Sequence, residues 1–509
     1  MQFTLAMLPL CMPIMLLIGF RCNAWQAGFA TLLAAVMPTL IFPFFNLSSE
    51  NLMTPLSQGF STSVTIFYLL FPSLLLYQVL QSVGSMNELG LGIANLVPYR
   101  DLQVLLLVVG LAPFAESVSG YGVGTVLVIP IFLALGFTPS QAAMLGLLGQ
   151  MAVPWGGLAV GTTLGAELTN LDPNILGART ALLTAPLPTI YGLVALTISG
   201  GFKAVHRWWK IVVMVGITLS GALYLFSLTL GVELAGILSG ILLMLFIFYC
   251  GKYCGKKNFY EIGHGKSSSS KHSNGKEVNL SNLSFLRSIA PYIILTILLI
   301  TSRLILPIRF WLQSHYVLSI PVINLTLPLL YNPGFYLFIV TLISAQIYNL
   351  SSTELLKLLR LTLKQFAPGA LAIFCFLSAS QIMQSNGMTT TLGTTVSTFG
   401  NNYKWVASFI AAIGGWVTGS SVGSNALFSR LQLEVSRQSG LPIYLLMGGQ
   451  NAASAHVTIV APTRIILAAT AARLNKGEAF LIQRLGPLVL IAIIIITLFT
   501  GIFSGNSIT

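Results

Sequence analysis

The sequence is poor in charged residues, and this scarcity excludes most soluble folds. Only 7% of its 509 residues are charged, whereas 55% are hydrophobic and the mean hydropathy is +0.85. A soluble domain carries about a quarter charged residues to face water. A chain with so little charge can place its surface only against lipid. The composition therefore predicts a multi-pass protein of the plasma membrane, and we expect the bacterial inner membrane.

Acidic residues are the scarcer charged class, with 12 Asp and Glu against 25 Lys and Arg. Such a basic excess can indicate nucleic-acid binding when the basic residues share one face. Here they lie in short connectors between apolar runs, where positive charge sets the topology of a membrane protein. We therefore expect the lipid bilayer, and no nucleic acid, as a partner.

Cysteine and histidine are also sparse, with five residues of each type. The cysteines form neither a disulfide framework nor a metal-ligand pattern. The sequence contains no nucleotide-binding loop, no paired acids at catalytic spacing and no nucleophile–base set. It thus predicts no cofactor, no metal site and no enzymatic activity.

Long apolar segments make up most of the chain, and several are shorter than the roughly 20 residues that span a membrane as a helix. The short segments lie beside glycine-rich breaks, a pattern typical of re-entrant hairpins and discontinuous helices. We expect an all-α polytopic membrane protein with two inverted-topology repeats, broken helices, re-entrant hairpins and about 12–14 spanning segments.

A polar, lysine-rich stretch at residues 251–285 divides the chain into halves. Its composition is typical of a flexible linker, and its positive charge places it in the cytoplasm. We expect an N-terminal half over residues 1–250 with a first repeat at about 60–200. The C-terminal half, residues 286–509, should hold a second repeat at about 360–500.

The two halves carry the same motif in the same register. Residues 77–84 and 380–387, 303 positions apart, both contain Gln-x-x-Gln-Ser-x-Gly. At the same offset, a Ser-x-x-Gly motif at residues 117–120 aligns with another at residues 420–423. A single ungapped register over about 60 residues predicts an internal repeat rather than chance similarity between apolar stretches.

Basic connectors predict that the repeats have opposite orientations. Connectors at residues 203–210 and 357–364 carry several Lys and Arg and should lie inside. Residues 366–384 then run outward, and residues 61–82 run inward. Inverted repeats with broken helices are typical of transporters, whose site lies near the midplane where the repeats meet.

The first candidate site is residues 115–125, where three glycines interrupt an apolar run. Freed backbone groups at membrane depth must line a polar cavity or be buried, and the helix resuming near Gly124 offers N–H donors to a carboxylate. Glu116 is a costly intramembrane acid that we expect to carry a proton. Helix packing by the glycines and an interfacial Glu116 are the structural alternatives. The predicted binding residues here are Ser117, Ser119, Gly120, Tyr121, Gly122, Gly124 and Thr125.

The mirror candidate is residues 418–428, whose hydroxyls and amide suit an anion or sodium. Breaks at residues 149–157 and 448–464 complete the predicted cavity. Arg464 would face a carboxylate bidentately, and His456 is a second proton-coupling candidate. A structural charge, a packing histidine and a serine-rich packing face are the alternatives. The predicted binding residues here are Ser420, Ser421, Gly423, Ser424, Asn425, Gln150, Gln450, Asn451 and Arg464.

These segments resemble the L-lactate permease family. Residues 384–388 and 418–428 are similar to its Asn-Gly-Met and Thr-Gly-Ser…Ser-Asn-Ala-Leu-Phe signatures, and Glu116 with the glycines behind it resembles its acidic block. The resemblance extends in order over about residues 60–500. It implies a membrane carrier of lactate and related 2-hydroxy monocarboxylates such as glycolate, normally coupled to protons.

The sequence departs from the family's pattern at three places. Ser421 stands where the family has an aspartate, Trp155 follows Pro154, and Thr463 ends a block that is Ser-Pro-Gln in the family. The chain is therefore similar to a divergent member, and the changes leave the coupling ion and the substrate open.

Proton-coupled import of L-lactate or a related small carboxylate by alternating access is the leading hypothesis. A sodium-coupled carrier of another small organic acid is the alternative among transporters. A channel and a membrane enzyme are the alternatives from other classes. The sequence also leaves open a homo-oligomer and the direction of net flux.

Overall fold

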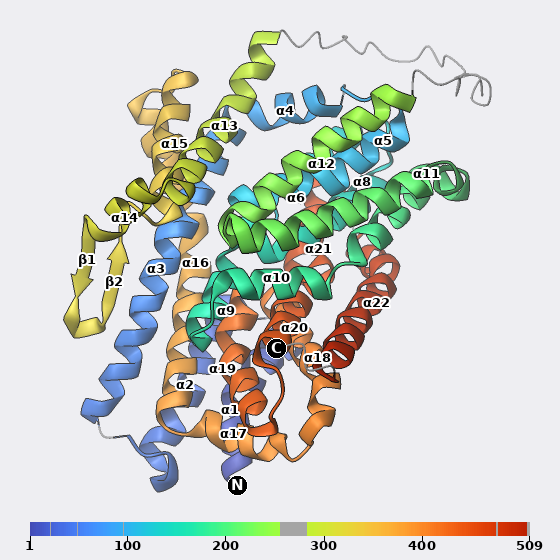
Figure 1. Cartoon of the computed structure of the whole chain (residues 1–509). Helices are drawn as coiled ribbons and strands as arrows, with labels where there is room; N and C mark the ends of the chain where they lie inside the picture. Colours follow the sequence, from blue (N-terminus) through green and yellow to red (C-terminus); the bar gives the residue numbers. More distant parts are fainter. Residues whose placement is uncertain (21, 48, 95, 255–281, 475–476, 506–509) are drawn as a thin grey trace.

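The computed structural model describes the chain except residues 21, 48, 95, 255–281, 475–476 and 506–509 (Figure 1). The linker expected at 251–285 falls mainly outside the described residues. In the described part, nine helices are long and apolar enough to cross a membrane, and a bent pair of helices adds a tenth. This is fewer than the 12–14 spans expected, because three further apolar helices have only 10–17 residues.

Helices make up nearly all of the described structure. The N-terminal half contains α1 (Gln2–Ile14), α2 (Ala24–Ile41), α3 (Ser49–Ser82), α4 (Ser85–Ala94), α5 (Arg100–Leu105), α6 (Ala112–Ser119), α7 (Val123–Ala134), α8 (Pro139–Leu148), α9 (Gly156–Thr169), α10 (Pro173–Leu183), α11 (Leu187–Thr229) and α12 (Val232–Cys254). The C-terminal half contains α13 (Asn282–Leu304), α14 (Leu306–Ser314), α15 (Pro333–Ile347), α16 (Ser352–Ser385), α17 (Met388–Ser397), α18 (Ala407–Thr418), α19 (Ser421–Ser439), α20 (Ile443–His456), α21 (Pro462–Ala471) and α22 (Glu478–Gly505). Strands β1 (Val317–Ile320) and β2 (Leu325–Pro328) pair antiparallel, with Val317 opposite Pro328.

The offset of 303 residues also relates the helix boundaries. Helices α3 and α16 begin and end at equivalent positions, and so do α4 and α17, which follow them. Local capping contributes to this agreement. Ser351 accepts from the Glu354 N–H at 3.3 Å while the Glu354 carboxylate accepts from the Ser351 N–H at 2.8 Å, a capping box that starts α16.

Helices α3 and α16 lie side by side and run in opposite directions. Phe60, early in α3, packs against Phe374 of α16. Gln78, late in α3, donates through Nε2 to Oε1 of Gln365, which precedes Phe374 on α16, at 2.6 Å. Helices α4 and α17 accordingly lie at opposite ends of the molecule (Figure 1). Phe67 of α3 and Phe366 of α16 pack edge to face along this contact, with ring centroids 5.4 Å apart.

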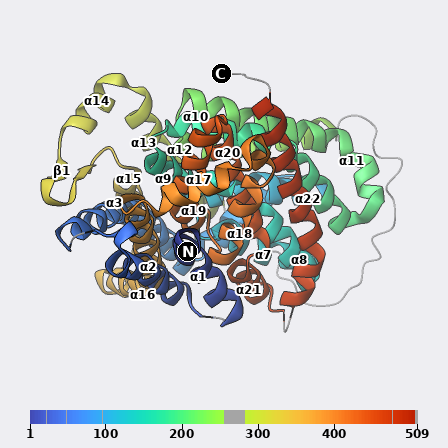
Figure 2. The same cartoon turned by 90° about the horizontal axis from the view of Figure 1, so that it is seen from below.

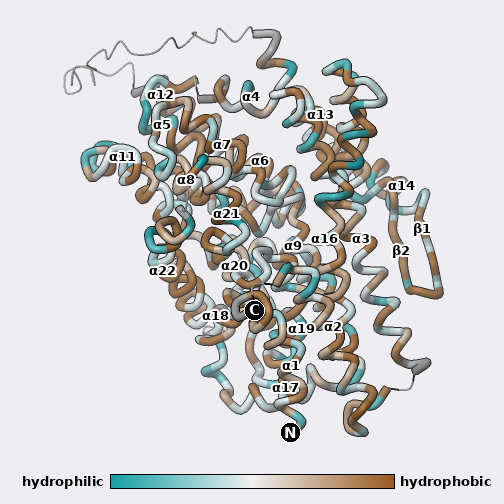
Figure 3. Tube along the Cα trace, turned by 180° about the vertical axis from the view of Figure 1, so that it is seen from behind, coloured by the Kyte–Doolittle hydropathy of each residue, from teal (hydrophilic) through white to brown (hydrophobic). Residues whose placement is uncertain are grey.

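The helices divide into two groups that face each other (Figures 1 and 2). Helices α2, α3, α13, α15 and α16 form an outer panel, along which hydrophobic residues predominate (Figure 3). The broken helices α6, α7, α9, α19 and α21 belong to an inner group. Helix α3 contacts α6 and α9, and α16 contacts α19, so the equivalent panel helices both meet the inner group.

Candidate functional site

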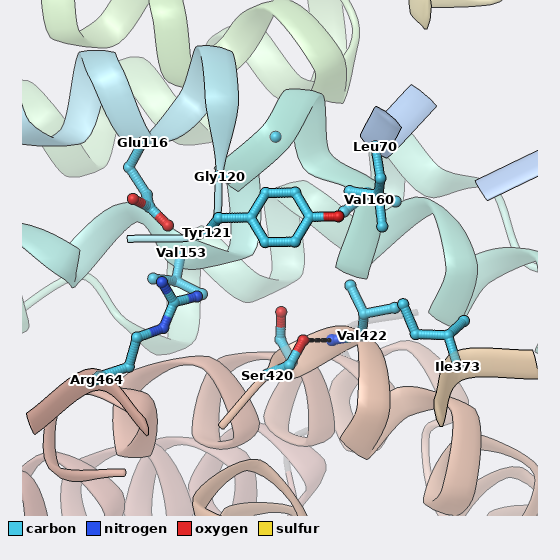
Figure 4. A pocket seen from close by; sticks show the side chains of 13 residues that line it. Leu70, Glu116, Gly120, Tyr121, Val153, Val160, Ile373, Ser420, Val422 and Arg464 are labelled. Atoms are coloured by element: carbon cyan, nitrogen blue, oxygen red, sulfur yellow. Dashed lines mark hydrogen bonds between the residues drawn. The ribbon is translucent and has the colours of Figure 1, made fainter. Parts of the chain in front are cut away.

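A cavity of about 70 Å³ lies where the inner group faces the panel (Figure 4). Its volume exceeds that needed for one water, so it admits a ligand of a few heavy atoms. Four segments of the inner group and the panel helices α3 and α16 form its wall. The lining residues are Leu70, Glu116, Gly120, Tyr121, Val153, Gly156, Gly157, Val160, Ile373, Ser420, Ser421, Val422 and Arg464.

A helix begins at three of the four inner segments. Helix α7 starts after Gly122, α19 after Ser420 and α21 after Ala461, whereas residues 157–159 of α9 have positive φ and the regular helix follows them. A helix N-terminus presents N–H donors and the positive end of the helix dipole. Three such ends around one cavity favour an anion over a cation.

Two of the breaks are left-handed turns that touch each other. Residues 120–122 have φ values of 68°, 55° and 82°, and residues 157–159 have 53°, 55° and 63°. Non-glycine residues adopt such angles only where the surrounding packing enforces them. A Cβ on Gly120 would lie 3.2 Å from the Gly157 backbone, so this contact requires glycine.

Glu116 is buried, and its carboxylate spans the break between α6 and α7. Oε1 accepts from the Gly122 N–H at 3.1 Å, and Oε2 accepts from the Gly124 N–H at 3.2 Å. The side chain thus occupies donors at the start of α7 that the sequence suggested for a substrate carboxylate. A bound anion must find its donors elsewhere in the cavity.

Arg464 supplies positive charge from the first turn of α21. Its guanidinium extends toward the Glu116 carboxylate, and the two groups attract each other electrostatically (Figure 4). This attraction joins one repeat to the other. A guanidinium has five N–H donors in a planar fork, so Arg464 can face a second carboxylate beside Glu116.

Hydroxyl groups line the cavity on both sides. Ser420 Oγ accepts from the Val422 N–H at 3.2 Å and so caps α19, while the neighbouring Ser421 is buried in the wall. Tyr121, whose side chain is 36% exposed, projects across the cavity toward Val160 (Figure 4). These hydroxyls are neutral partners for a ligand that carries both a carboxylate and a hydroxyl.

Several residues predicted from the sequence lie outside the cavity wall. Ser117 Oγ donates to the Pro113 carbonyl oxygen at 2.7 Å, within its own helix. Ser119 is buried but does not line the cavity. Gly124 and Gly423 leave no room for a Cβ and serve close packing at the breaks.

Thr125 and Gln150 lie behind the cavity. Thr125 Oγ1 donates to the Gly146 carbonyl oxygen at 3.0 Å and accepts from Gln150 Nε2 at 2.7 Å. Thr458 Oγ1 of the second repeat donates to Gln150 Oε1 at 3.5 Å. These contacts join α7, α8 and the segment that precedes α21.

The amides of the second repeat form a buried polar network of their own. Asn425 Nδ2 donates to the Gly161 carbonyl oxygen at 2.9 Å and to Asn451 Oδ1 at 3.0 Å. Gln450 Nε2 donates to Ser424 Oγ at 3.1 Å and to Asn425 Oδ1 at 3.2 Å. Because these groups are mutually satisfied, the network holds α19 against α9 and α20 and so positions the two cavity serines.

His456 is buried away from the cavity, at the end of α20. Its Nδ1 lies 3.1 Å from Tyr191 Oη, and its Nε2 has no hydrogen-bond partner among the described residues. It does not line the cavity that Glu116 lines, and its part in proton coupling stays a prediction.

The panel contributes two lining residues that sequence reasoning missed. Leu70 of α3 and Ile373 of α16 are equivalent at the offset of 303 residues, and both face the cavity. The repeat offset was the available signal, since neither side chain has a chemical signature. The predicted set also lacked five further lining residues, which are Val153, Gly156, Gly157, Val160 and Val422.

A polytopic helical protein whose broken helices meet at a charged cavity is, by class, a membrane transport protein. Within the described residues, no group of three His, Cys, Asp or Glu side chains is placed to hold a metal. The chain belongs to the L-lactate permease family, whose model matches residues 2–321 and 312–504. It is therefore a permease and not an enzyme.

Named relatives span most of the chain. The L-lactate permease of Escherichia coli (strain K12) is 22% identical over 512 residues, covering 94% of this chain and 91% of that protein. Glycolate permease GlcA of the same strain is 23% identical over 515 residues, with the same coverage. Among solved structures, the Alcanivorax borkumensis YdaH transporter is 13% identical, with a TM-score of 0.48 and 90% of each chain covered.

Proposed function

We propose that this permease imports L-lactate or a related small 2-hydroxy monocarboxylate such as glycolate, with a proton, across the plasma membrane. The observation that carries the proposal is the Arg464 guanidinium in a small cavity among three helix N-termini. The names of its lactate and glycolate relatives support this substrate class. The small cavity favours a substrate of few heavy atoms.

In this proposal, the substrate carboxylate pairs with Arg464, while its 2-hydroxyl bonds to Ser420, Ser421 or Tyr121. An arginine–carboxylate pair with two parallel hydrogen bonds gives both affinity and orientation. The apolar lining residues Leu70, Val153, Val160 and Ile373 then contact the rest of the substrate. A methyl group against these side chains would distinguish lactate from glycolate by about 1–3 kcal/mol.

Glu116 is the residue that we expect to carry the proton. A bound anion competes with Glu116 for Arg464, and transfer of one proton to Glu116 keeps the net charge of the cavity unchanged. Moving a monoanion with one proton is electroneutral, so uptake should follow a pH gradient. Uptake of labelled lactate by proteoliposomes that ignored an imposed pH gradient would contradict proton coupling.

Glu116→Gln should abolish uptake driven by a pH gradient while preserving lactate counterflow, because glutamine retains a hydrogen-bond acceptor for α7 but carries no proton. Glu167→Gln is the matched control. Glu167 is an acid on α9 that accepts from Thr62 Oγ1 at 3.3 Å and does not line the cavity. Undiminished gradient-driven uptake by Glu116→Gln would remove Glu116 from the coupling step.

Sodium coupling is the second candidate, motivated by the cavity hydroxyls and by Ser421 where the family has an aspartate. Uncharged oxygens can ligate sodium at broken helices. Proteoliposome uptake at fixed pH, with and without a sodium gradient, separates the candidates. Proton coupling predicts no change, whereas strong stimulation by sodium would replace it.

A further inference from the structure

A second cavity, unlike the candidate site in chemistry, lies between panel helix α13 and helices α4, α6 and α12. Its volume is about 470 Å³. Aliphatic and aromatic side chains make up its wall, and Tyr292 and Thr296 are the only polar residues that line it in the described structure. Nothing in the proposed transport reaction uses this space.

The polar groups in this wall are already hydrogen-bonded. Tyr292 Oη donates to Met86 Sδ at 2.7 Å, and Thr296 Oγ1 donates to the Tyr292 carbonyl oxygen at 2.7 Å. An apolar cavity without unmet polar groups does not hold ordered water. Burial of a small carboxylate there would be costly, because its charge would have no partner. The occupant must therefore be apolar.

The cavity opens toward the lipid-facing surface. Its floor is buried, since Leu106 is 1% and Phe114 5% exposed. Its rim is exposed, since Leu245 is 61%, Ile293 47% and Ile297 57% exposed. The rim residues lie on α12 and α13, both of which are long and apolar enough to cross the membrane. The medium at this opening is therefore hydrocarbon.

A positive charge lies at one end of the cavity. Ile241, Leu245 and Phe248 face the cavity from α12, and the exposed Lys252 follows one turn later on the same helix face. A lysine at the end of a spanning helix reaches the level of lipid phosphates. At the other end, the Arg303–Glu233 ion pair joins α13 to α12, with Nε and Oε2 2.6 Å apart.

We propose that this cavity binds one membrane phospholipid, with an acyl chain against Phe114 and Phe285 and the phosphate at Lys252. Phe114 also packs against Tyr292 of α13, with ring centroids 5.3 Å apart, and precedes Glu116 by two residues on α6. The bound chain therefore touches both the panel and the helix that carries the acid of the candidate site. The lipid is a structural ligand between the two groups of helices.

The test uses the full-length protein in nanodiscs that contain a phosphatidylcholine with a photoactivatable group midway along one acyl chain. Labelled peptides should come mainly from α12 and α13, and excess unlabelled phospholipid added before illumination should compete. Ile241→Trp and Ile289→Trp fill the cavity and should lower this labelling. Ile217→Trp on α11, at a position 66% exposed, is the matched control and should not. Lys252→Gln should weaken labelling about fivefold.

Labelling that is spread evenly over α11, α12 and α13, and that the tryptophan variants leave unchanged, would overturn the proposal in favour of ordinary lipid solvation. If a tryptophan variant fails to fold, the proposal is tested by the competition of unlabelled phospholipid for labelling of the unmodified protein. Non-saturable labelling there would also overturn the proposal. Detergent-purified protein that retains no phospholipid phosphorus would also overturn the proposal.

Discussion

At the scale of single residues, Arg464 is the side chain on which substrate affinity should depend most. Arg464→Gln should raise the KM for lactate about 10- to 100-fold, because it removes a charge-assisted hydrogen bond to the carboxylate. Arg464→Lys keeps the charge but lacks the planar fork, so its KM for lactate should lie between those of the unmodified protein and Arg464→Gln. Initial rates of labelled lactate uptake in proteoliposomes measure both variants.

The control for this prediction lies two residues beyond the end of the same helix. Arg473 is exposed and outside the cavity wall, so Arg473→Gln removes the same charge without touching the site. A KM that rose equally in Arg464→Gln and Arg473→Gln would show a general electrostatic effect. An unchanged KM in Arg464→Gln would remove Arg464 from substrate binding.

Two serines show how far the sequence predicts residue roles. Ser117 and Ser420 are equivalent in the repeats, and the sequence assigned both to binding. Helix α6 continues past Ser117 to residue 119, so its hydroxyl bonds to a carbonyl one turn back. Helix α18 ends at Thr418, one turn earlier in the repeat, so Ser420 falls at the break and lines the cavity. The outcome depends on where each helix breaks, which composition does not encode.

At the scale of secondary-structure elements, the contact between the two left-handed turns should limit stability. Gly120→Ala adds a Cβ against the Gly157 backbone, at a φ and ψ (68°, −153°) that only glycine adopts readily. Gly201→Ala is the matched control, since Gly201 has nearly the same φ and ψ (65°, −163°) but open space around its Cβ position. Gly201→Ala should cost about 1–3 kcal/mol and Gly120→Ala clearly more.

Thermal unfolding in detergent, followed by Tm, measures this difference. Gly120→Ala should also reduce lactate uptake, because the turn holds the start of α7 against Glu116. Equal Tm values for the two variants would show that only the backbone angle matters and that the contact between the turns contributes nothing.

Element boundaries were partly accessible from the sequence. The Gln-x-x-Gln-Ser-x-Gly motif lies at the ends of α3 and α16, so its offset carries over to the boundaries of both helices. The turn at residues 157–159 was not accessible. Leu158 and Ala159 have no preference for positive φ, and both are fully buried, so the surrounding packing holds them there.

At the scale of the whole molecule, alternating access requires the inner group to move relative to the panel. Thr62 of α3 and Glu167 of α9 touch across this boundary, with Oγ1 and Oε1 3.3 Å apart. Cysteines at both positions, in a background without native cysteines and joined by a short cleavable reagent, should stop uptake. Cleavage of the reagent should restore it, and each variant is compared before and after crosslinking.

The control crosslink joins two helices within the panel. Gln78 and Gln365 are 2.6 Å apart between Nε2 and Oε1, so cysteines there accept the same reagent. This crosslink should leave uptake unchanged, because α3 and α16 move together. Uptake that survives the crosslink between residues 62 and 167 would contradict motion at that boundary.

The antiparallel pairing of α3 with α16 has a consequence for the ancestry of the chain. Each helix contacts, in the opposite direction, the helix that is equivalent to it at the offset of 303 residues. A contact between equivalent helices is of the self-complementary kind. Two separate half-length chains, inserted into the membrane in opposite directions, would make the same contact as a homodimer. Gene duplication and fusion of such a dual-orientation protein would yield this pair of helices directly.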